Sequence, residues 1–453
     1  MPRMVILGAG LSGLAIASRQ PSCVVLEASS RVGGWAHSVR RSEHGGHLFE
    51  VGPHSLRLRG CANSLAVLDL FERIKIEPIQ AAPEAKKRLI WHHGALVAMP
   101  DSLLSALRNP VTRAVPWYYV KDILGLSPPR PQHDETVHEF VSRKFSPEVA
   151  DSLVTAFVAG VYAGDASRLS SQAVFKEAVH REDCVGSAFR PSLMNLARRS
   201  LASSSRNKSS VISFTQGMSE LAAVLHASLK PSCEVRLNDP VVFMRRDKHQ
   251  WLVQTAAGAE HVAKTVVSTL PLAQLQAVLP AAFSPMLDAC VAKLGTVDVA
   301  VVNLRYESQT PPLAFGHLVA SVPEQVKTGV LGVIYDSVVF PVQQMGDRGC
   351  VVSVMMGGAH APWVATLPAD ELVRRASAVM ATHCGFNDAP VDALATVHFN
   401  CIPQCTPGHM QRAVFARQEL GDSGCVALGT GMLGVGMVDA IGGSLRAMDW
   451  FED

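Results

Sequence analysis

Residues 5–35 read VILGAGLSGLAIASRQPSCVVLEASSRVGGW, and this stretch decides the fold of the N-terminal part of the chain. An apolar strand runs directly into the turn GAGLSG, and a predicted helix follows over residues 11–19. Gly8 allows the tight turn, Gly10 allows the close approach of a pyrophosphate, and Gly13 allows the helix to pack on the sheet. The first helical N–H groups would point at phosphate oxygens. The stretch therefore predicts a Rossmann-like dinucleotide-binding unit.

The residues that follow indicate which dinucleotide is bound. A second strand ends at Glu27, 19 residues after Gly8, and this spacing suits an acid that binds a ribose hydroxyl. The run EASSRVGGW then brings Arg31, Gly33 and Gly34, and it resembles the second flavoprotein signature, which follows the FAD pyrophosphate. The alternative is a glycine-rich surface turn. Near the other end, GCVALGTGMLGVGMVDAIGGSLRA (424–447) predicts a strand, a glycine-rich loop and a helix. We expect both chain ends to build one FAD-binding fold.

Composition limits the function classes. The chain has 453 residues, of which 48% are hydrophobic, and this length favours two or three domains. The formal net charge is only +2, so we expect no nucleic-acid partner. The ten cysteines include no CxxC pair, and no metal site is expected. The first strand leaves no room for a targeting peptide, and no apolar run reaches the ~18 to 20 residues of a spanning helix.

The rest of the chain alternates strands and helices. A hairpin is predicted over residues 87–100 with His93-Gly94 at its turn, and a helix over residues 146–162 with Ser146 as N-cap. Residues 201–210 are Ser-rich and predict a loop. Residues 233–255 predict a pair of strands, and residues 369–384 a helix.

Several stretches resemble one family, the oxygen-dependent protoporphyrinogen oxidases, and the match is nearest to the animal and fungal branch. The motifs GVYAGD…LS and IPQ…GH are more specific than the dinucleotide fingerprint. The matching stretches are residues 134–170, 299–306, 315–319, 329–341 and 400–411.

This resemblance implies an α/β protein with α+β insertions, in three interwoven parts. A Rossmann-like FAD-binding domain would use residues 1–75, 205–270 and 402–453. A mixed-sheet substrate domain would use residues 76–98 and 271–401, and a helical membrane-binding domain would use residues 99–204.

The resemblance also implies an activity and a location. Protoporphyrinogen IX would lose six electrons to three O₂, through FAD, to give protoporphyrin IX and three H₂O₂ in the penultimate step of haem synthesis. The enzyme would be monotopic on the intermembrane-space face of the mitochondrial inner membrane. A homodimer and a contact with ferrochelatase are implied partners.

Site residues carry over position by position. Arg88 matches an arginine that faces a substrate propionate, and a guanidinium can hold a carboxylate by two parallel hydrogen bonds. No catalytic base is assigned, because such an oxidation needs position and dryness more than a strong base. The expected substrate-binding residues are Arg88, Phe315, Gly316, Leu318, Met355 and His54. The expected FAD-binding residues are Gly8, Gly10, Leu11, Ser12, Gly13, Glu27, Ala28, Gly34, Trp35, Gly52, His54, Ser55, Val241, Val435, Gly436 and Met437.

Three departures from the family pattern stand out. The animal enzymes have arginine in GPRG near the flavin, whereas this chain has His54 in GPHS. Met410 replaces a tryptophan near the isoalloxazine, and MLGVGMVD (432–439) lacks the tyrosine and asparagine of the usual C-terminal pattern. Since histidine titrates near neutrality, the activity could depend on pH. These changes indicate altered flavin packing and not another reaction.

Two segments suit a membrane surface. Residues 102–128 mix apolar and aromatic side chains with cations, including Trp117, Tyr118 and Tyr119. Residues 184–210 contain no acidic side chain and carry five basic ones: Arg190, Arg198, Arg199, Arg206 and Lys208. The alternative is an ordinary helical domain with a solvated basic loop.

Two other functions stay open. One is another enzyme of the flavin amine-oxidase group, such as a polyamine oxidase or a carotenoid desaturase. The other is a flavin-bearing protein that binds porphyrin without turnover.

Overall fold

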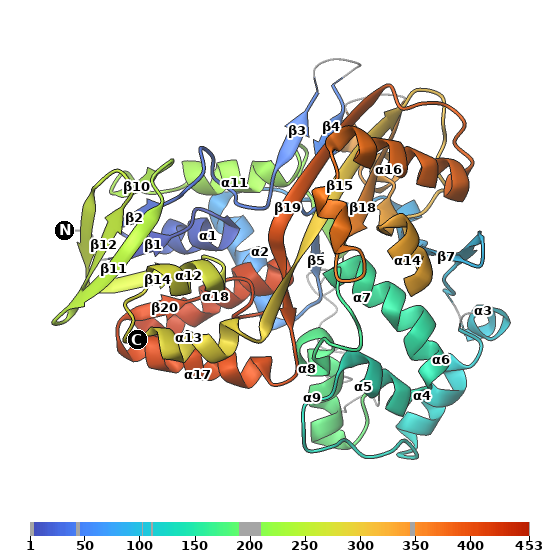
Figure 1. The fold of residues 1–453 in the computed structure, drawn as a ribbon, viewed down its shortest axis with the longest axis horizontal. Helices are drawn as coiled ribbons and strands as arrows, with labels where there is room; N and C mark the ends of the chain where they lie inside the picture. Colours follow the sequence, from blue (N-terminus) through green and yellow to red (C-terminus); the bar gives the residue numbers. More distant parts are fainter. Residues whose placement is uncertain are drawn as a thin grey trace.

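The computed structural model describes residues 4–41, 46–101, 103–109, 112–189, 210–344 and 349–452. Figure 1 shows a nucleotide-binding half with both chain ends, a large mixed sheet, and a helical part beneath that sheet. The α/β class expected from the sequence is confirmed.

The nucleotide-binding half is built on a five-stranded parallel sheet. Its strands come from three distant segments of the chain, in the order β10-β2-β1-β14-β20. They are β1 (Met4–Leu7), β2 (Cys23–Leu26), β10 (Cys233–Arg236), β14 (Thr265–Ser268) and β20 (Cys425–Ala427). Three of these strands are buried along their whole length, as expected for a parallel sheet covered on both faces.

Two layers cover this sheet. Helices pack on one face: α1 (Leu11–Arg19), α2 (Ala62–Ile74), α11 (Met218–Ala227) and α18 (Met437–Glu452). The other face carries α12 (Leu272–Val278), α13 (Ser284–Val291), α17 (His409–Asp422) and the antiparallel strands β11 (Val241–Asp247), β12 (Gln250–Thr255) and β13 (Glu260–Ala263). Residues 233–255, predicted as a pair of strands, form three: β11 and β12 pair as a hairpin, and β10 joins the parallel sheet instead.

The second sheet has seven strands in the order β19-β15-β18-β17-β16-β7-β8. Every neighbouring pair is antiparallel except β16 and β7. The strands are β7 (Leu89–His92), β8 (Ala95–Ala98), β15 (Leu294–Tyr306), β16 (Gly316–Val319), β17 (Val330–Ile334), β18 (Cys350–Gly357) and β19 (Asp392–Cys405). The predicted hairpin is confirmed, and His93 and Gly94 both adopt positive φ at its turn.

The helical part contains α3 (Leu103–Arg108), α4 (Val115–Ile123), α5 (Val137–Lys144), α6 (Pro147–Val149), a π-helical turn (Ala150–Val154), α7 (Thr155–Tyr162), α8 (Ser171–Val174) and α9 (Lys176–Val185). The helix predicted over residues 146–162 is confirmed, with the π turn inside it. Ser146 accepts a hydrogen bond from the N–H of Val149, so it caps the helix as expected.

A buried ion-pair cluster holds these helices together. Lys144 Nζ lies 2.7 Å from Asp122 Oδ1 and 2.6 Å from Glu182 Oε1, and all three side chains are buried. Arg143 donates to the carboxylates of Glu135 and Glu182. Asp122 is the one buried residue among the described side chains of α4. Asp122 therefore faces the protein, whereas Trp117, Tyr119 and Val120 of the same helix are exposed.

α7 and β19 connect the nucleotide-binding half, the seven-stranded sheet and the helical part. α7 lies so close to the second sheet that a Cβ on Gly160 would stand 2.2 Å from Leu318 Cδ2. Along β19, Asp392 accepts from His47, His398 contacts Val51, and Gln404 donates to the carbonyl of Tyr162. β19 thus contacts both the nucleotide-binding half and the helical part, and Figure 1 shows it running between them.

Candidate functional site

The glycine turn between β1 and α1 has the geometry of a phosphate-binding loop. Gly8 adopts a φ of 95°, and a Cβ on Gly13 would stand 2.0 Å from the carbonyl oxygen of Gly8, so neither position tolerates a side chain. A Cβ on Gly10 would have no atom within 4 Å, which leaves open space in front of the helix N-terminus. Leu11 and Ser12 begin α1 and present its first N–H groups. This arrangement fits a dinucleotide pyrophosphate.

Glu27 is fixed at the carboxyl end of β2. Its Oε2 accepts from the N–H of Ala9 at 2.7 Å, and its Oε1 accepts from the N–H of Ser29 at 2.9 Å. Ala28 follows it and is exposed. The carbonyl of Glu27 also accepts from the N–H of Asp239, two residues before Val241. The structure therefore brings Glu27, the glycine turn and the start of β11 to one edge of the sheet.

Arg31 organises the second glycine loop from inside. Its guanidinium donates to the carbonyls of Val32, Gly34 and Ala36, at 3.2, 2.7 and 3.3 Å. The N–H of Gly33 donates to the carbonyl of Ala9 at 2.8 Å. The two glycine loops consequently lie against each other, as one continuous cofactor-binding surface requires.

Trp35 and Gly52 extend this surface toward the second sheet. A Cβ on Gly52 would stand 1.9 Å from the carbonyl oxygen of Trp35, so glycine is required there. The rings of Trp35 and His398 meet edge to face, with centroids 5.4 Å apart. His398 Nε2 also contacts the carbonyl oxygen of Val51. No signal in the sequence pointed to His398, because its contacts lie almost 350 residues away along the chain.

His54 lies in a buried polar network between the nucleotide-binding half and the seven-stranded sheet. Its Nδ1 is 2.7 Å from Asp336 Oδ1, and Asp336 Oδ2 accepts from the hydroxyl of Ser353 at 2.6 Å. Burial alone would lower the pKa of His54, but the carboxylates of Asp336 and Glu50 outweigh it and raise that pKa. His54 Nε2 is buried and has no hydrogen-bond partner among the described residues. Ser55 follows and is half-buried.

Glu50 is the third titratable group of this network, after His54 and Asp336. Its carboxylate accepts from the N–H of Met218 and from the hydroxyl of Ser38, both at 2.7 Å. Burial raises the pKa of Glu50 to about 8, although the charge of His54 acts in the opposite direction. Sequence reasoning missed Glu50 and Asp336, although Asp336 lies within the matching stretch 329–341.

The C-terminal glycine loop approaches the same region. Gly434 adopts a φ of 140° and lies against Asp439, and Gly436 is exposed just before α18 begins at Met437. Asp439 Oδ1 accepts from Asn63 Nδ2 at 2.9 Å, which ties this end of α18 to α2. Val435 lies half-buried in the same loop.

Two of the expected substrate residues meet at the start of β7 and β16. The Arg88 guanidinium lies over the ring of Phe315, 4.7 Å from its centroid. Burial, and then the nearby charge of Arg57, lower the pKa of Arg88. Gly316 has a φ of 153°, and a Cβ there would stand 2.0 Å from the carbonyl oxygen of Val333.

Leu318 and Met355 lie on the face of the sheet that α7 covers. Leu318 pairs with Gly332 across β16 and β17, and Gly332 pairs with Met355 across β17 and β18. Paired residues share one face of a sheet, so these two apolar side chains flank a position without one. The Leu318 side chain covers the Gly332 position, since a Cβ there would stand 3.0 Å from Leu318 Cδ2.

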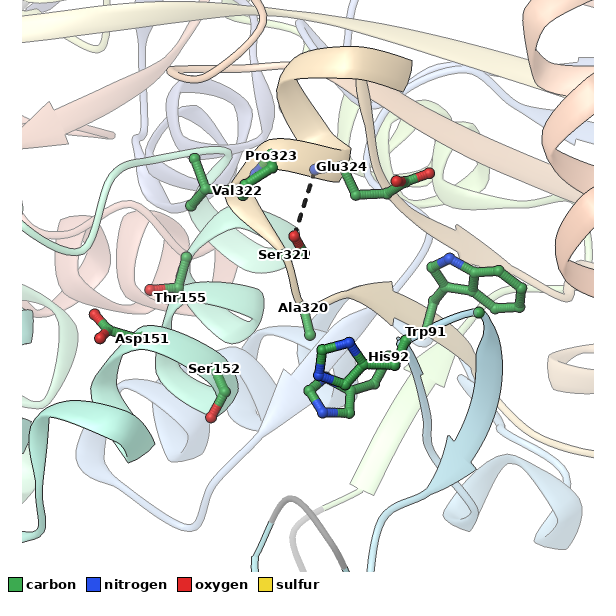
Figure 2. Close-up of a pocket in the computed structure, with 12 residues that line it drawn as sticks. Trp91, His92, Asp151, Ser152, Thr155, Ala320, Ser321, Val322, Pro323 and Glu324 are labelled. Atoms are coloured by element: carbon green, nitrogen blue, oxygen red, sulfur yellow. Dashed lines mark hydrogen bonds between the residues drawn. The ribbon is translucent and has the colours of Figure 1, made fainter.

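A cavity of about 510 Å³ lies elsewhere, at the opposite end of β7 and β16. Figure 2 shows it between the hairpin residues Trp91 and His92, the helical residues Asp151 and Thr155, and Ser321, which accepts from the N–H of Glu324. It contains none of the expected site residues.

Comparison with known proteins defines the class first. A family model described as flavin containing amine oxidoreductase matches residues 11–447. The structure is similar to UDP-galactopyranose mutase, with a TM-score of 0.72 and 14% identity over 100% of this chain and 96% of that chain. It is also similar to a candidate protoporphyrinogen oxidase from Exiguobacterium sp. 255-15, with a TM-score of 0.80 and 21% identity over 100% and 98% of the two chains. The chain is an FAD-dependent oxidoreductase.

The similar curated proteins narrow this class. Protoporphyrinogen oxidase of Homo sapiens is 33% identical over 92% of this chain and 91% of its own length. The Schizosaccharomyces pombe protein of the same name is 28% identical over 90% and 89%. The chain belongs to the flavin-containing amine oxidoreductase family, on the branch of the protoporphyrinogen oxidases.

Proposed function

We propose that this protein oxidises protoporphyrinogen IX to protoporphyrin IX. Six electrons would pass through FAD to three O₂ and give three H₂O₂. The observation that carries the proposal is the 33% identity with the human protoporphyrinogen oxidase along 92% of the chain. The Arg88–Phe315 pair adds a cation beside an aromatic ring, which suits a tetrapyrrole with acid side chains.

The residues of this chain position the substrate and keep water away from it. Arg88 would hold a propionate, and Leu318 and Met355 would contact the apolar macrocycle. Gly8, Gly10, Gly13 and Glu27 would hold the nucleotide end of FAD, and FAD supplies the hydride acceptor.

Purified protein tests this proposal directly. With protoporphyrinogen IX, porphyrin fluorescence should rise faster than autoxidation while O₂ is consumed. Arg88→Ala should raise KM and leave the FAD content unchanged. A flavin-containing protein without any such turnover would contradict the proposal. Turnover of a polyamine or of a carotenoid precursor would favour another enzyme of the family, and porphyrin binding without turnover would favour a binding protein.

We also propose that α4 docks on a membrane surface. Trp117 is 65% exposed and Leu124 is 67% exposed, and Tyr119, Val120 and Leu126 are exposed beside them. Lys121 and Arg113 supply nearby cations. Exposed apolar and aromatic groups with cations are typical of interfacial helices. In the part of the chain that the structure describes, no helix is long and apolar enough to span a bilayer. The basic side chains at positions 190, 198, 199, 206 and 208 lie outside the described residues.

Flotation with cardiolipin-containing liposomes tests this docking. The wild-type protein should float with the liposomes, and replacement of Trp117 and Leu124 by serine should return it to the soluble fraction. Complete recovery of the wild-type protein in the soluble fraction would count against docking. The intermembrane-space face of the mitochondrial inner membrane, a homodimer and a contact with ferrochelatase are further parts of the proposal. They are supported by the resemblance to the animal and fungal enzymes.

A further inference from the structure

A second arginine faces the patch where Arg88 lies. Arg57 is the exposed central residue of β5 (Leu56–Leu58), between two buried leucines. It stands directly opposite Val211 of β9 (Ser210–Ser213), so the two side chains share one face of that small sheet. Val211 packs in the same apolar cluster as Phe315, the ring beneath the Arg88 guanidinium. Arg57 and Arg88 therefore approach one apolar surface from two sides.

The positive charge of Arg57 also acts on Arg88. Burial lowers the pKa of both arginines, and the charge of Arg57 lowers the pKa of Arg88 further. Arg59 adds a third positive charge next to Arg57, and Tyr162 lies beside both.

Within the described ranges no carboxylate forms an ion pair with this group, although the charge of Asp439 also acts on Tyr162. None of the side chains of Arg57, Arg59 and Arg88 forms an ion pair there, whereas Arg143 in the helical part is bonded to two glutamates. All three arginines are exposed, so an anion from solvent can reach them, and a cluster of like positive charges attracts anions. The group is therefore suited to an anionic ligand.

We propose that Arg57 is a second carboxylate-binding residue, so that a ligand with two adjacent acid side chains is held by Arg88 at one and by Arg57 at the other. This inference rests on the proposed function, whose substrate carries two propionates on one side. Two separate arginine–carboxylate contacts would also fix the rotation of a flat macrocycle in the site, which one contact does not. Arg57 is thus a specificity-determining residue for a dicarboxylate.

Binding of the product and of its esters tests the inference without turnover. The flavin-loaded protein is titrated with protoporphyrin IX, with its monomethyl esters and with its dimethyl ester, and the Kd of each is measured by fluorescence. The wild-type protein should bind the diacid about tenfold more tightly than the monoesters, since a charged hydrogen-bonded contact is lost. In Arg57→Ala this ratio should fall close to one, and KM for protoporphyrinogen IX should rise by about tenfold.

Matched variants separate the carboxylate contact from a general loss of charge or of folding. Arg245→Ala removes an exposed strand arginine on β11 and should keep the wild-type ratio. Arg57→Lys keeps the charge and should restore part of the preference, and Arg57→Gln, which removes the charge but keeps a polar side chain, replaces Arg57→Ala if the alanine variant loses its flavin. Arg57→Ala protein that keeps the wild-type ratio and KM would overturn the inference and leave the proposed function intact. Wild-type protein that does not oxidise protoporphyrinogen IX would overturn the proposed function itself.

Discussion

The buried contact of Lys144 offers a sharp test of how the helical part is held together. Lys144→Met keeps the length of the side chain and removes its charge. Asp122 would keep the hydroxyl of Ser187 at 2.6 Å and the N–H of Phe189 at 3.1 Å, but it would lose its counter-ion. Burial alone would raise the pKa of Asp122, and hydrogen bonds from Lys144 and Ser187 now outweigh burial and lower it.

The magnitude follows from burial. The side chains of Lys144 and Asp122 are each 1% exposed, so solvent cannot replace the lost partner. Breaking one side of a buried pair costs about 3 to 5 kcal/mol. The helical part should then open about 200- to 5,000-fold more often, and native-state proteolysis should cut residues 112–189 faster by a similar factor.

Two comparisons decide whether the reasoning holds. Lys144→Met combined with Asp122→Asn removes both charges. This double variant should recover more than half of the protection against proteolysis that Lys144→Met loses. Lys176→Met replaces an exposed lysine on α9, and this variant should be cleaved by the protease at the wild-type rate. Cleavage of Lys144→Met within about threefold of the wild-type rate, or a double variant no better than the single one, would refute an energetic role for this ion pair.

Three further predictions concern the site. Gly13→Ala should yield protein without FAD, since the added Cβ would stand 2.0 Å from the Gly8 carbonyl oxygen, and the flavin absorbance of the purified protein measures this. Gly160→Ala should displace Leu318 and raise KM several-fold at unchanged FAD content, because that Cβ would stand 2.2 Å from Leu318 Cδ2; an unaltered KM would place Leu318 outside the substrate site. The raised pKa of Glu50, about 8, means that its protonated form stabilises the fold below the unfolded pKa and that this stabilisation is lost as pH rises from about 4.5 through 8. Glu50→Gln should therefore match the wild-type protein in urea melts near pH 4.5 and exceed its stability near pH 9, whereas a constant difference would contradict the assignment.

The local part of the fold could be predicted from the sequence. The strand, the glycine turn and α1 follow from steric needs within one short stretch, and Gly8 and Gly13 have the geometry that this stretch requires. The hairpin turn at His93 and the Ser146 cap were predicted for the same reason. In each case the residues that determine the structure are neighbours along the chain.

Long-range pairing could not be predicted in this way. β7 lies parallel to β16, more than 220 residues later, and nothing in either strand specifies the other. His54 was singled out as a departure from the family pattern, yet its partner Asp336 lies 282 residues away in a short helix. The FAD and substrate residues taken from the resemblance stay predictions, and the structure adds His398, Glu50 and Arg57 beside them.

The length of β19 has an evolutionary consequence. Asp392, His398 and Gln404 lie on this one strand and contact His47, Val51 and Tyr162 in turn. An insertion or deletion of one residue between any two of them would shift the register and separate at least one of these contacts. Relatives of this protein should therefore vary in length in their surface loops and keep this segment free of gaps.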